Sequence, residues 1–277
     1  TRRSSDLVLG GKKIYGMAEF KLLPPASRHY IVEWIGHALE RKEGLIALRY
    51  FFVEATLNGN NLGVYALEEH FNKELLENRK AREGIIFTEK ENKIKIFNEK
   101  KISKDNNKRN QIRLLRSALQ SVKNSEIEID RLFDLKKYAA HFAIIDLMNS
   151  YHAVGINAFY YFNPVTNLVE PITREYNSLR YSEGRPNATM FAADMYLEQG
   201  DSFFFIKKLF QNKEFIAQYL FQLIKLSDQK YLDEFFGEID EDLNVQKNIL
   251  YRDYPFYKFP KEYLYERQQQ IVGWLNK

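Results

Sequence analysis

The 277-residue chain contains no cysteine, which excludes disulfide bonds, thiol nucleophiles and thiolate metal sites. It also lacks any uninterrupted apolar run approaching the roughly 20 residues of a membrane-spanning helix. An excess of one charge sign is missing too, because 41 basic and 37 acidic residues leave a formal charge of only +4. So small a net charge gives no reason to expect nucleic-acid binding.

A secretory signal peptide is also missing, and the abrupt start at Thr1 suggests a fragment. The location is therefore open: the protein is soluble, or it is a cell-surface or secreted protein whose N-terminal signal was removed. What the chain does have is 45% hydrophobic and 15% aromatic residues, which argue against disorder. A chain of this length can form a two-lobed domain with a sizeable core.

The most informative stretch is predicted to be a β-hairpin over residues 156–173. Residues 156–162 and 168–173 are rich in apolar and aromatic residues, and the turn-forming sequence NPVTN lies between them. In an antiparallel hairpin the start of the first strand lies beside the end of the second. Polar residues that flank the two strands should therefore come together at the open end.

Three polar residues flank this hairpin. If the turn is centred near Val165, Asn157 lies roughly opposite Thr173. His152, Asn157 and Glu175 should then gather at the open end. An amide oxygen and a carboxylate placed this way could hold a hard divalent cation such as Mg²⁺, which prefers oxygen ligands. The alternative is that the end of the hairpin is polar simply because water reaches it.

The remaining patterns predict an α+β protein. Two apolar segments around Asn58-Gly59 predict a second hairpin over residues 48–67. A helix with Ser27 as its N-cap is predicted to continue to Lys42. Helical spacing also predicts four C-terminal helices, over residues 202–211, 213–226, 228–251 and 261–277.

Three segments resemble the CotH kinase family, the spore-coat protein H group of atypical, protein-kinase-like proteins. The segment YHAVGINAFYYFNPVTNLVEPITREYN is similar to the family's central Asn, hairpin and following acidic residue. The segment LNGNNLGVYALEE is similar to its "NG..GVY...E" hallmark, and IYGMAEFKLLPPASR is similar to its N-terminal part. The likeness covers nearly everything from Ile14 onward.

The resemblance implies an atypical protein-kinase-like fold with two lobes. Residues 1–110 would form a β-rich N-terminal lobe, and residues 111–277 a mostly helical C-terminal lobe that carries the central hairpin. The implied activity is ATP- and Mg²⁺-dependent phosphorylation of Ser or Thr in a protein, with a basic, Ser-rich protein as the expected substrate.

The resemblance also implies roles for five residues. Asn157 and Glu175 would hold the metal, with Glu175 in place of the usual Asp. His152 stands where a catalytic Asp is often found, and an imidazole can accept a proton although it does not attract a cation. Arg28 at the start of a helix could reach a phosphate group. Glu69 in the hallmark could orient a lysine or meet the nucleotide.

Alternatives remain open for two of these residues. Arg28 could be a surface arginine that pairs with a nearby acid. Glu69 could be a charge on the first turn of the following helix, where the helix dipole favours an acid, and the adjacent Glu68 could play the same part as Glu69.

Two other classes of function compete with a kinase. The departures at His152 and Glu175 also fit a pseudokinase-like module that binds a nucleotide or partner with weak or no catalysis. A nucleic-acid binder would use the basic concentration in residues 93–116. Residues 102–110 within it lack the interleaved aromatic residues that stack on single strands, so we predict instead a mobile, solvated connector at the lobe boundary.

Overall fold

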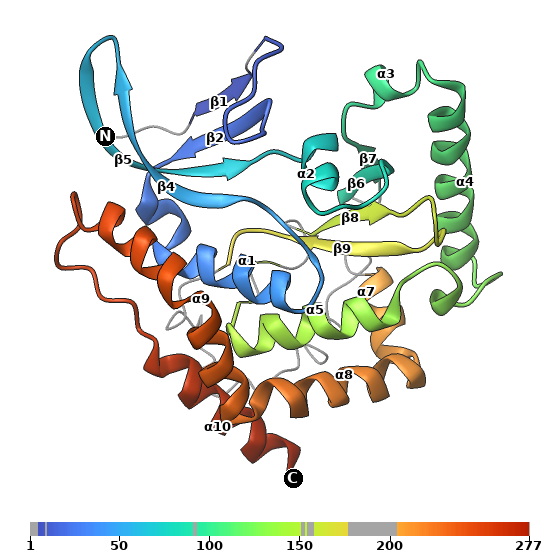
Figure 1. Cartoon of the computed structure of the whole chain (residues 1–277). Coiled ribbons are helices and arrows are strands. Elements are labelled where there is room, and N and C mark those ends of the chain that lie inside the picture. Colours follow the sequence, from blue (N-terminus) through green and yellow to red (C-terminus); the bar gives the residue numbers. More distant parts are fainter. Residues whose placement is uncertain are drawn as a thin grey trace.

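The computed structural model describes residues 5–8, 10–90, 93–150, 153, 158–176 and 204–276. Figure 1 shows two β-sheets in the upper part of the view and the helices of the C-terminal half packed below them. The α+β class predicted from the sequence is confirmed. None of the helices that the structure describes is long and apolar enough to cross a membrane.

The first sheet has four strands and contains the hairpin predicted around Asn58-Gly59. Its strands, in spatial order, are β1 (Ser5–Val8), β2 (Glu19–Leu23), β5 (Asn60–Glu69) and β4 (Tyr50–Leu57). Asn58 and Gly59 connect β4 to β5 with φ values of 50° and 80°. Asn and Gly adopt this left-handed conformation more readily than other residues, which is why the pair marks the turn. The predicted hairpin is confirmed.

The second sheet has five strands and contains the predicted central hairpin. Its strands, in spatial order, are β3 (Ile46–Ala47), β9 (Val169–Thr173), β8 (Phe159–Phe162), β6 (Ile85–Lys90) and β7 (Lys93–Ile96). β3 runs parallel to β9, and the other neighbours are antiparallel. Strands before and after residue 110 therefore share this sheet, and the predicted lobe boundary does not separate them.

The register of the central hairpin differs by one residue from the prediction. Phe159 pairs with Ile172 and Phe162 with Val169. The connection begins at Asn163, whose backbone N–H donates to Leu168 O at 2.9 Å, so the turn is centred one half-residue beyond Val165. A shift of one residue exchanges the faces on which the side chains lie. The register of the described strands therefore differs by one residue from the register that would pair Asn157 with Thr173.

The basic stretch over residues 93–116 forms regular elements rather than the predicted mobile connector, although residues 97–111 are exposed or half-buried as a solvated segment would be. It forms β7, the short helix α3 (Glu99–Ile102) and the first part of α4 (Asn106–Lys123). α4 buries Ile112, Leu115 and further apolar residues at helical spacing, which anchors the helix to the core. The helix also runs through the predicted boundary at residue 110.

The other helices follow the predicted order. Those of the first half and centre are the 3₁₀ turn η1 (Pro25–Arg28), α1 (Ile31–Lys42), α2 (Lys73–Asn78), η2 (Ile129–Arg131) and α5 (Leu135–Leu147). The four predicted C-terminal helices are confirmed as α7 (Phe204–Gln211), α8 (Lys213–Ser227), α9 (Gln229–Leu250) and α10 (Glu262–Leu275). Ser27 is not the N-cap of α1, because it lies inside η1 and its hydroxyl donates to Pro24 O.

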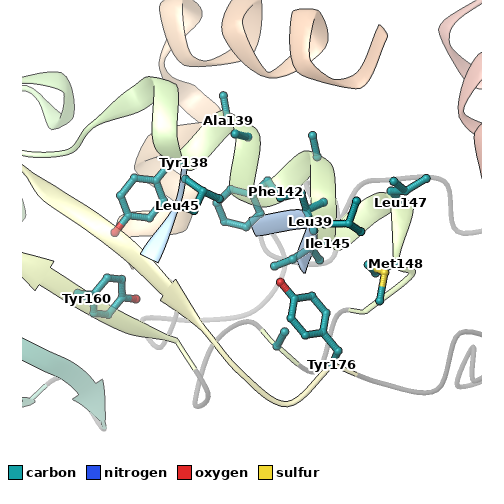
Figure 2. Packing of buried hydrophobic residues seen from close by; sticks show 14 of the residues in the cluster. Leu39, Leu45, Tyr138, Ala139, Phe142, Ile145, Leu147, Met148, Tyr160 and Tyr176 are labelled. Carbon is teal, nitrogen blue, oxygen red and sulfur yellow. The ribbon is translucent and has the colours of Figure 1, made fainter. Parts of the chain in front are cut away.

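The core lies between the five-stranded sheet and the C-terminal helices, around α5. Figure 2 shows Tyr138, Phe142 and Ile145 along this helix, with Tyr160 and Tyr176 approaching from the sheet side. All five are buried. Tyr176 also packs against Gly36 of α1 so closely that a Cβ there would lie 2.4 Å from the Tyr176 ring. This contact fixes the segment after β9 against α1.

Candidate functional site

Four charged side chains meet where the two sheets approach each other, and we call them the ionic cluster. Arg28 closes η1, Glu68 lies near the end of β5, and Arg174 and Glu175 follow β9 directly. Arg28 donates to Glu68 and to Glu175, in both cases at 2.9 Å. Arg174 lies 3.6 Å from Glu68 and 3.4 Å from Glu175. Two carboxylates thus alternate with two guanidinium groups.

The ionic cluster is closed on one side and open on the other. The Glu68 side chain is 1% exposed, whereas those of Arg28, Arg174 and Glu175 are 15–19% exposed. Burial opposes the charge of Arg28, but Glu68, Glu33 and Glu175 more than offset it and raise the pKa of Arg28. The guanidinium of Arg174 lies 4.8 Å from the ring centre of Phe159. Both arginines are therefore charged, held in place and partly accessible.

A third basic side chain belongs to the same face of the sheet. Lys21 of β2 pairs directly with Glu68 of β5, and directly paired residues of antiparallel strands project on the same side. The sequence prediction did not single out Lys21. The feature that could have identified it is its position in β2, which places Lys21 opposite Glu68.

A second group of polar side chains lies behind the ionic cluster and is fully enclosed. We call Glu33, His37, Glu40 and His141 the buried acid–imidazole chain. His37 lies 3.3 Å from Glu33 and 3.2 Å from Glu40, and His141 lies 3.8 Å from Glu40. The hydroxyl of Thr173, the last residue of β9, lies 2.8 Å from His141 Nδ1. The buried acid–imidazole chain thus joins α1, α5 and the end of β9.

His37 and Glu40 of the buried acid–imidazole chain keep their charges although they are buried. Burial alone would lower the pKa of His37, but its interactions with Glu33 and Glu40 raise the pKa to about 9. Burial would raise the pKa of Glu40, but its interactions with His141 and His37 lower it. At neutral pH an imidazolium therefore lies between two carboxylates.

Glu33 connects the two groups through the backbone. Its Oε1 and Oε2 accept the backbone N–H groups of Glu175 and Tyr176, both at 2.7 Å. Glu175 itself has φ of 66°, a left-handed conformation that is uncommon for a residue with a Cβ. Strained backbone of this kind is often found at functional sites. Glu33 therefore holds Glu175 in the conformation that directs its side chain to Arg28.

The structure brings together some of the predicted site residues. Arg28 and Glu175 are in direct contact, and Arg28 is paired with acids as the alternative interpretation predicted. Glu68 joins them, whereas Glu69 does not. His152 and Asn157 lie outside the described residues, so their predicted roles stay predictions.

Glu69 contributes to the fold at a different place. It is the last residue of β5 and not part of a helical turn, so the alternative that placed it there is wrong. Its carboxylate accepts the backbone N–H of Arg49 at 3.0 Å and also binds the Arg49 guanidinium. Because side chains alternate along a strand, Glu69 points away from the face of Glu68.

The described residues do not by themselves make a metal site. Among them, no group of three His, Asp or Glu side chains is arranged to hold a metal ion. The two carboxylates of the ionic cluster are both ion-paired with arginine. Glu175 and Asn157 as magnesium ligands remain a prediction, because Asn157 lies outside the described residues.

Comparison with known proteins places the chain in a family. No curated protein matches it significantly. The sequence profile of the CotH kinase protein family matches residues 12–277. The matched range includes the whole ionic cluster and the buried acid–imidazole chain, and it covers far more than half of the sequence. The chain therefore belongs to the CotH kinase protein family.

Proposed function

We propose that the protein is a CotH-type kinase that uses ATP and Mg²⁺ to phosphorylate Ser or Thr hydroxyls of another protein. The observation that carries the proposal is the ionic cluster, in which Arg28 and Arg174 are held beside Glu175 with one side open to solvent. Phosphoryl transfer depends mainly on positioning and on neutralising the charge of the phosphates. Fixed, partly accessible guanidinium groups supply both.

The roles we assign follow from the chemistry of each side chain. Arg28, with Lys21 and Arg174 beside it, would bind the phosphates of the nucleotide. Glu175 and Asn157 would hold Mg²⁺, which would neutralise phosphate charge when bound. His152 would accept the proton of the attacking hydroxyl, since a neutral imidazole is a suitable base near pH 7.

The acceptor we propose is a hydroxyl in a basic, Ser-rich protein. This substrate class was expected from the family resemblance. A nucleic acid is not the expected partner, because α4 uses its apolar face for the core and its basic residues are interspersed along a packed helix.

A second candidate is a pseudokinase-like binding module. It is favoured by His152, which stands where a catalytic Asp is often found in the family. This module would bind Mg-ATP or a partner through the same ionic cluster without transferring phosphate. A thermal-shift assay with Mg-ATP separates the two, because ligand binding raises the unfolding temperature whether or not turnover occurs.

The test is transfer of labelled phosphate from ATP. The purified protein is incubated with labelled ATP, Mg²⁺ and a basic, Ser-rich protein, and Glu175→Gln is compared with Glu234→Gln, a matched change at an exposed site on α9. We expect label on the acceptor with the native protein and with Glu234→Gln, and a loss of at least tenfold with Glu175→Gln. Stabilisation by Mg-ATP without any transferred label would select the binding module instead.

A further inference from the structure

Two adjacent pockets lie at the opposite end of α1 from the ionic cluster. Their volumes are about 350 and 440 Å³, and they share Arg41, Asn78 and Arg79 in their linings. We call the combined depression the Arg41–Arg79 groove. α1 has 12 residues, so at about 1.5 Å per residue its ends are roughly 18 Å apart. The two shared arginines therefore lie toward the other end of α1 from Arg28, although Tyr50, which lines one pocket, pairs directly with Glu68 of the ionic cluster.

The two arginines that the pockets share have unused hydrogen-bond donors. Arg41 lies in the last turn of α1 with its guanidinium 5.9 Å from the ring centre of Trp34. Throughout the described ranges the guanidinium of Arg41 forms neither a hydrogen bond nor an ion pair. Arg79 follows α2, and its Nε donates to Ala47 O at 2.7 Å. Its two terminal nitrogens have no partner among the described residues.

Acidic groups do not neutralise the groove. Glu170 lines one pocket but is already bound by Lys137 and Asn163, both at 2.7 Å. Asp242 of α9 lines the other pocket and forms no ion pair with a described residue. The linings also contain Arg49, Lys80 and Lys137, of which Arg49 is bound to Glu69. Positive charge therefore exceeds negative charge along the groove.

The electrostatics of the arginines agree with this excess. Arg41 is exposed as a whole residue, yet desolvation of its guanidinium and the charge of Arg79 lower its pKa to about 10, against the opposing charges of Glu40 and Asp242. Desolvation and the charge of Arg49 likewise lower the pKa of Arg79, against the opposing charges of Glu69 and Glu40. Both stay protonated at neutral pH, and a bound anion would relieve their mutual repulsion.

We propose that the Arg41–Arg79 groove binds the phosphate group of a phosphorylated Ser or Thr side chain in a partner protein. Guanidinium groups bind phosphate through paired N–H donors, and Arg41 and Arg79 have such donors free. The amide groups of Asn78 and Gln246 line the groove beside them. Gln246 Oε1 accepts the backbone N–H of Phe52 at 2.8 Å, which leaves its amide N–H₂ for a bound peptide.

This binding does not depend on catalysis by the protein itself. A phosphorylated segment held by Arg41 and Arg79 would bring a neighbouring part of the same partner toward the ionic cluster, since Tyr50 of the groove pairs with Glu68 of that cluster. If the protein is a kinase, the groove would favour partners that already carry phosphate. If it is a binding module, the groove would serve as its recognition site.

The experiment measures binding of a fluorescent peptide to the full chain by anisotropy, without ATP. The probe is a short Gly- and Ser-rich peptide with one phosphoserine, compared with the same peptide carrying Ser or Asp at that position. Arg41→Gln is the main variant, because the Arg41 guanidinium makes no hydrogen bond with a described residue. Arg113→Gln, exposed on α4, is the matched control, and Arg79→Gln is the second variant.

We expect the phosphoserine peptide to bind at least tenfold more tightly than the Ser and Asp peptides. Arg41→Gln should weaken its binding at least tenfold, while Arg113→Gln leaves it unchanged. Binding that survives in both Arg41→Gln and Arg79→Gln would overturn the proposal, as would equal binding of the Ser peptide. Inorganic phosphate that binds as tightly as the phosphopeptide would show a site for a free anion only and would also overturn it.

Discussion

The ionic cluster and the buried acid–imidazole chain contain similar charges in different surroundings. In the buried chain Glu33, His37 and Glu40 are at most 1% exposed, and their carboxylates and imidazole face one another. In the ionic cluster Arg28 and Glu175 are 15% and 19% exposed. Charges that are fully enclosed cannot contact a ligand from solvent, whereas partly exposed ones can. Glu175 joins the two regions, through its backbone to one and its side chain to the other.

The largest effect should come from removing Glu33. We expect Glu33→Ala to lower the free energy of unfolding by about 3–5 kcal/mol, because it leaves a buried imidazolium without one of its partners. It also leaves the backbone N–H groups of Glu175 and Tyr176 without an acceptor. Urea unfolding measures this, with Glu241→Ala at an exposed site of α9 as the control. An equal, small loss in both variants would contradict the distinction between the two regions.

The second effect is the pH dependence of stability that His37 causes. Its pKa is raised from 6.5 to about 9 in the folded protein, so its stabilisation is complete below pH 6.5 and is lost as pH rises through about 9. We expect a loss of about 3 kcal/mol over this range. The contribution of Glu40 has the opposite sign, since its pKa is lowered: it is present above pH 4.5 and is lost as pH falls through the lowered value.

Unfolding free energies measured from pH 6.5 to above pH 9 test the His37 slope, and those measured below pH 4.5 test the Glu40 slope. The matched comparison is His37→Asn, which should lose stability at low pH and show a much flatter dependence between pH 6.5 and pH 9. If the native protein and His37→Asn show the same slope, His37 is not charged in the folded state.

A smaller effect is expected from the ionic cluster. Arg28→Ala should cost about 1–2 kcal/mol, because Glu68 is buried and loses a charged hydrogen bond while Arg174 remains beside it. The contribution of Glu175 is reduced by its exposure to solvent. Urea unfolding is again the measurement. A loss as large as that of Glu33→Ala would show that the cluster is a structural element rather than a binding site.

The smallest effect is expected from a pair on the surface. Arg252 lies 2.6 Å from Glu54, with side chains 58% and 48% exposed. We expect Arg252→Ala to change the free energy of unfolding by less than about 0.5 kcal/mol, because solvent screens such pairs. A larger loss would mean that exposure does not rank these interactions, and the comparison between the two regions would lose its basis.

Much of the fold could be predicted from local patterns. The Asn58-Gly59 hairpin and the four C-terminal helices were predicted correctly, because turn conformation and helical periodicity depend on a few neighbouring residues. The register of the central hairpin was not, since it depends on the bonds of Asn163. Its side chain accepts the backbone N–H of Val165, and its own N–H donates to Leu168.

The candidate site could be predicted only in part. Arg28 and Glu175 were named from the family resemblance, and the structure places them in contact. The choice of Glu68 over Glu69 depends on which face of β5 turns toward β9, and a single strand does not reveal that. His37 was missed, although Glu33 and Glu40 at helical spacing on either side of it were a signal for a buried ion pair.

The most direct test of the central claim is the binding of Mg-ATP to the ionic cluster, measured by calorimetry on the full chain. Arg28→Gln is compared with Arg113→Gln, which removes the same charge from an exposed site on α4. We predict that the native protein and Arg113→Gln bind equally and that Arg28→Gln binds at least tenfold more weakly. Unchanged affinity in Arg28→Gln would contradict the assignment of this cluster to the nucleotide.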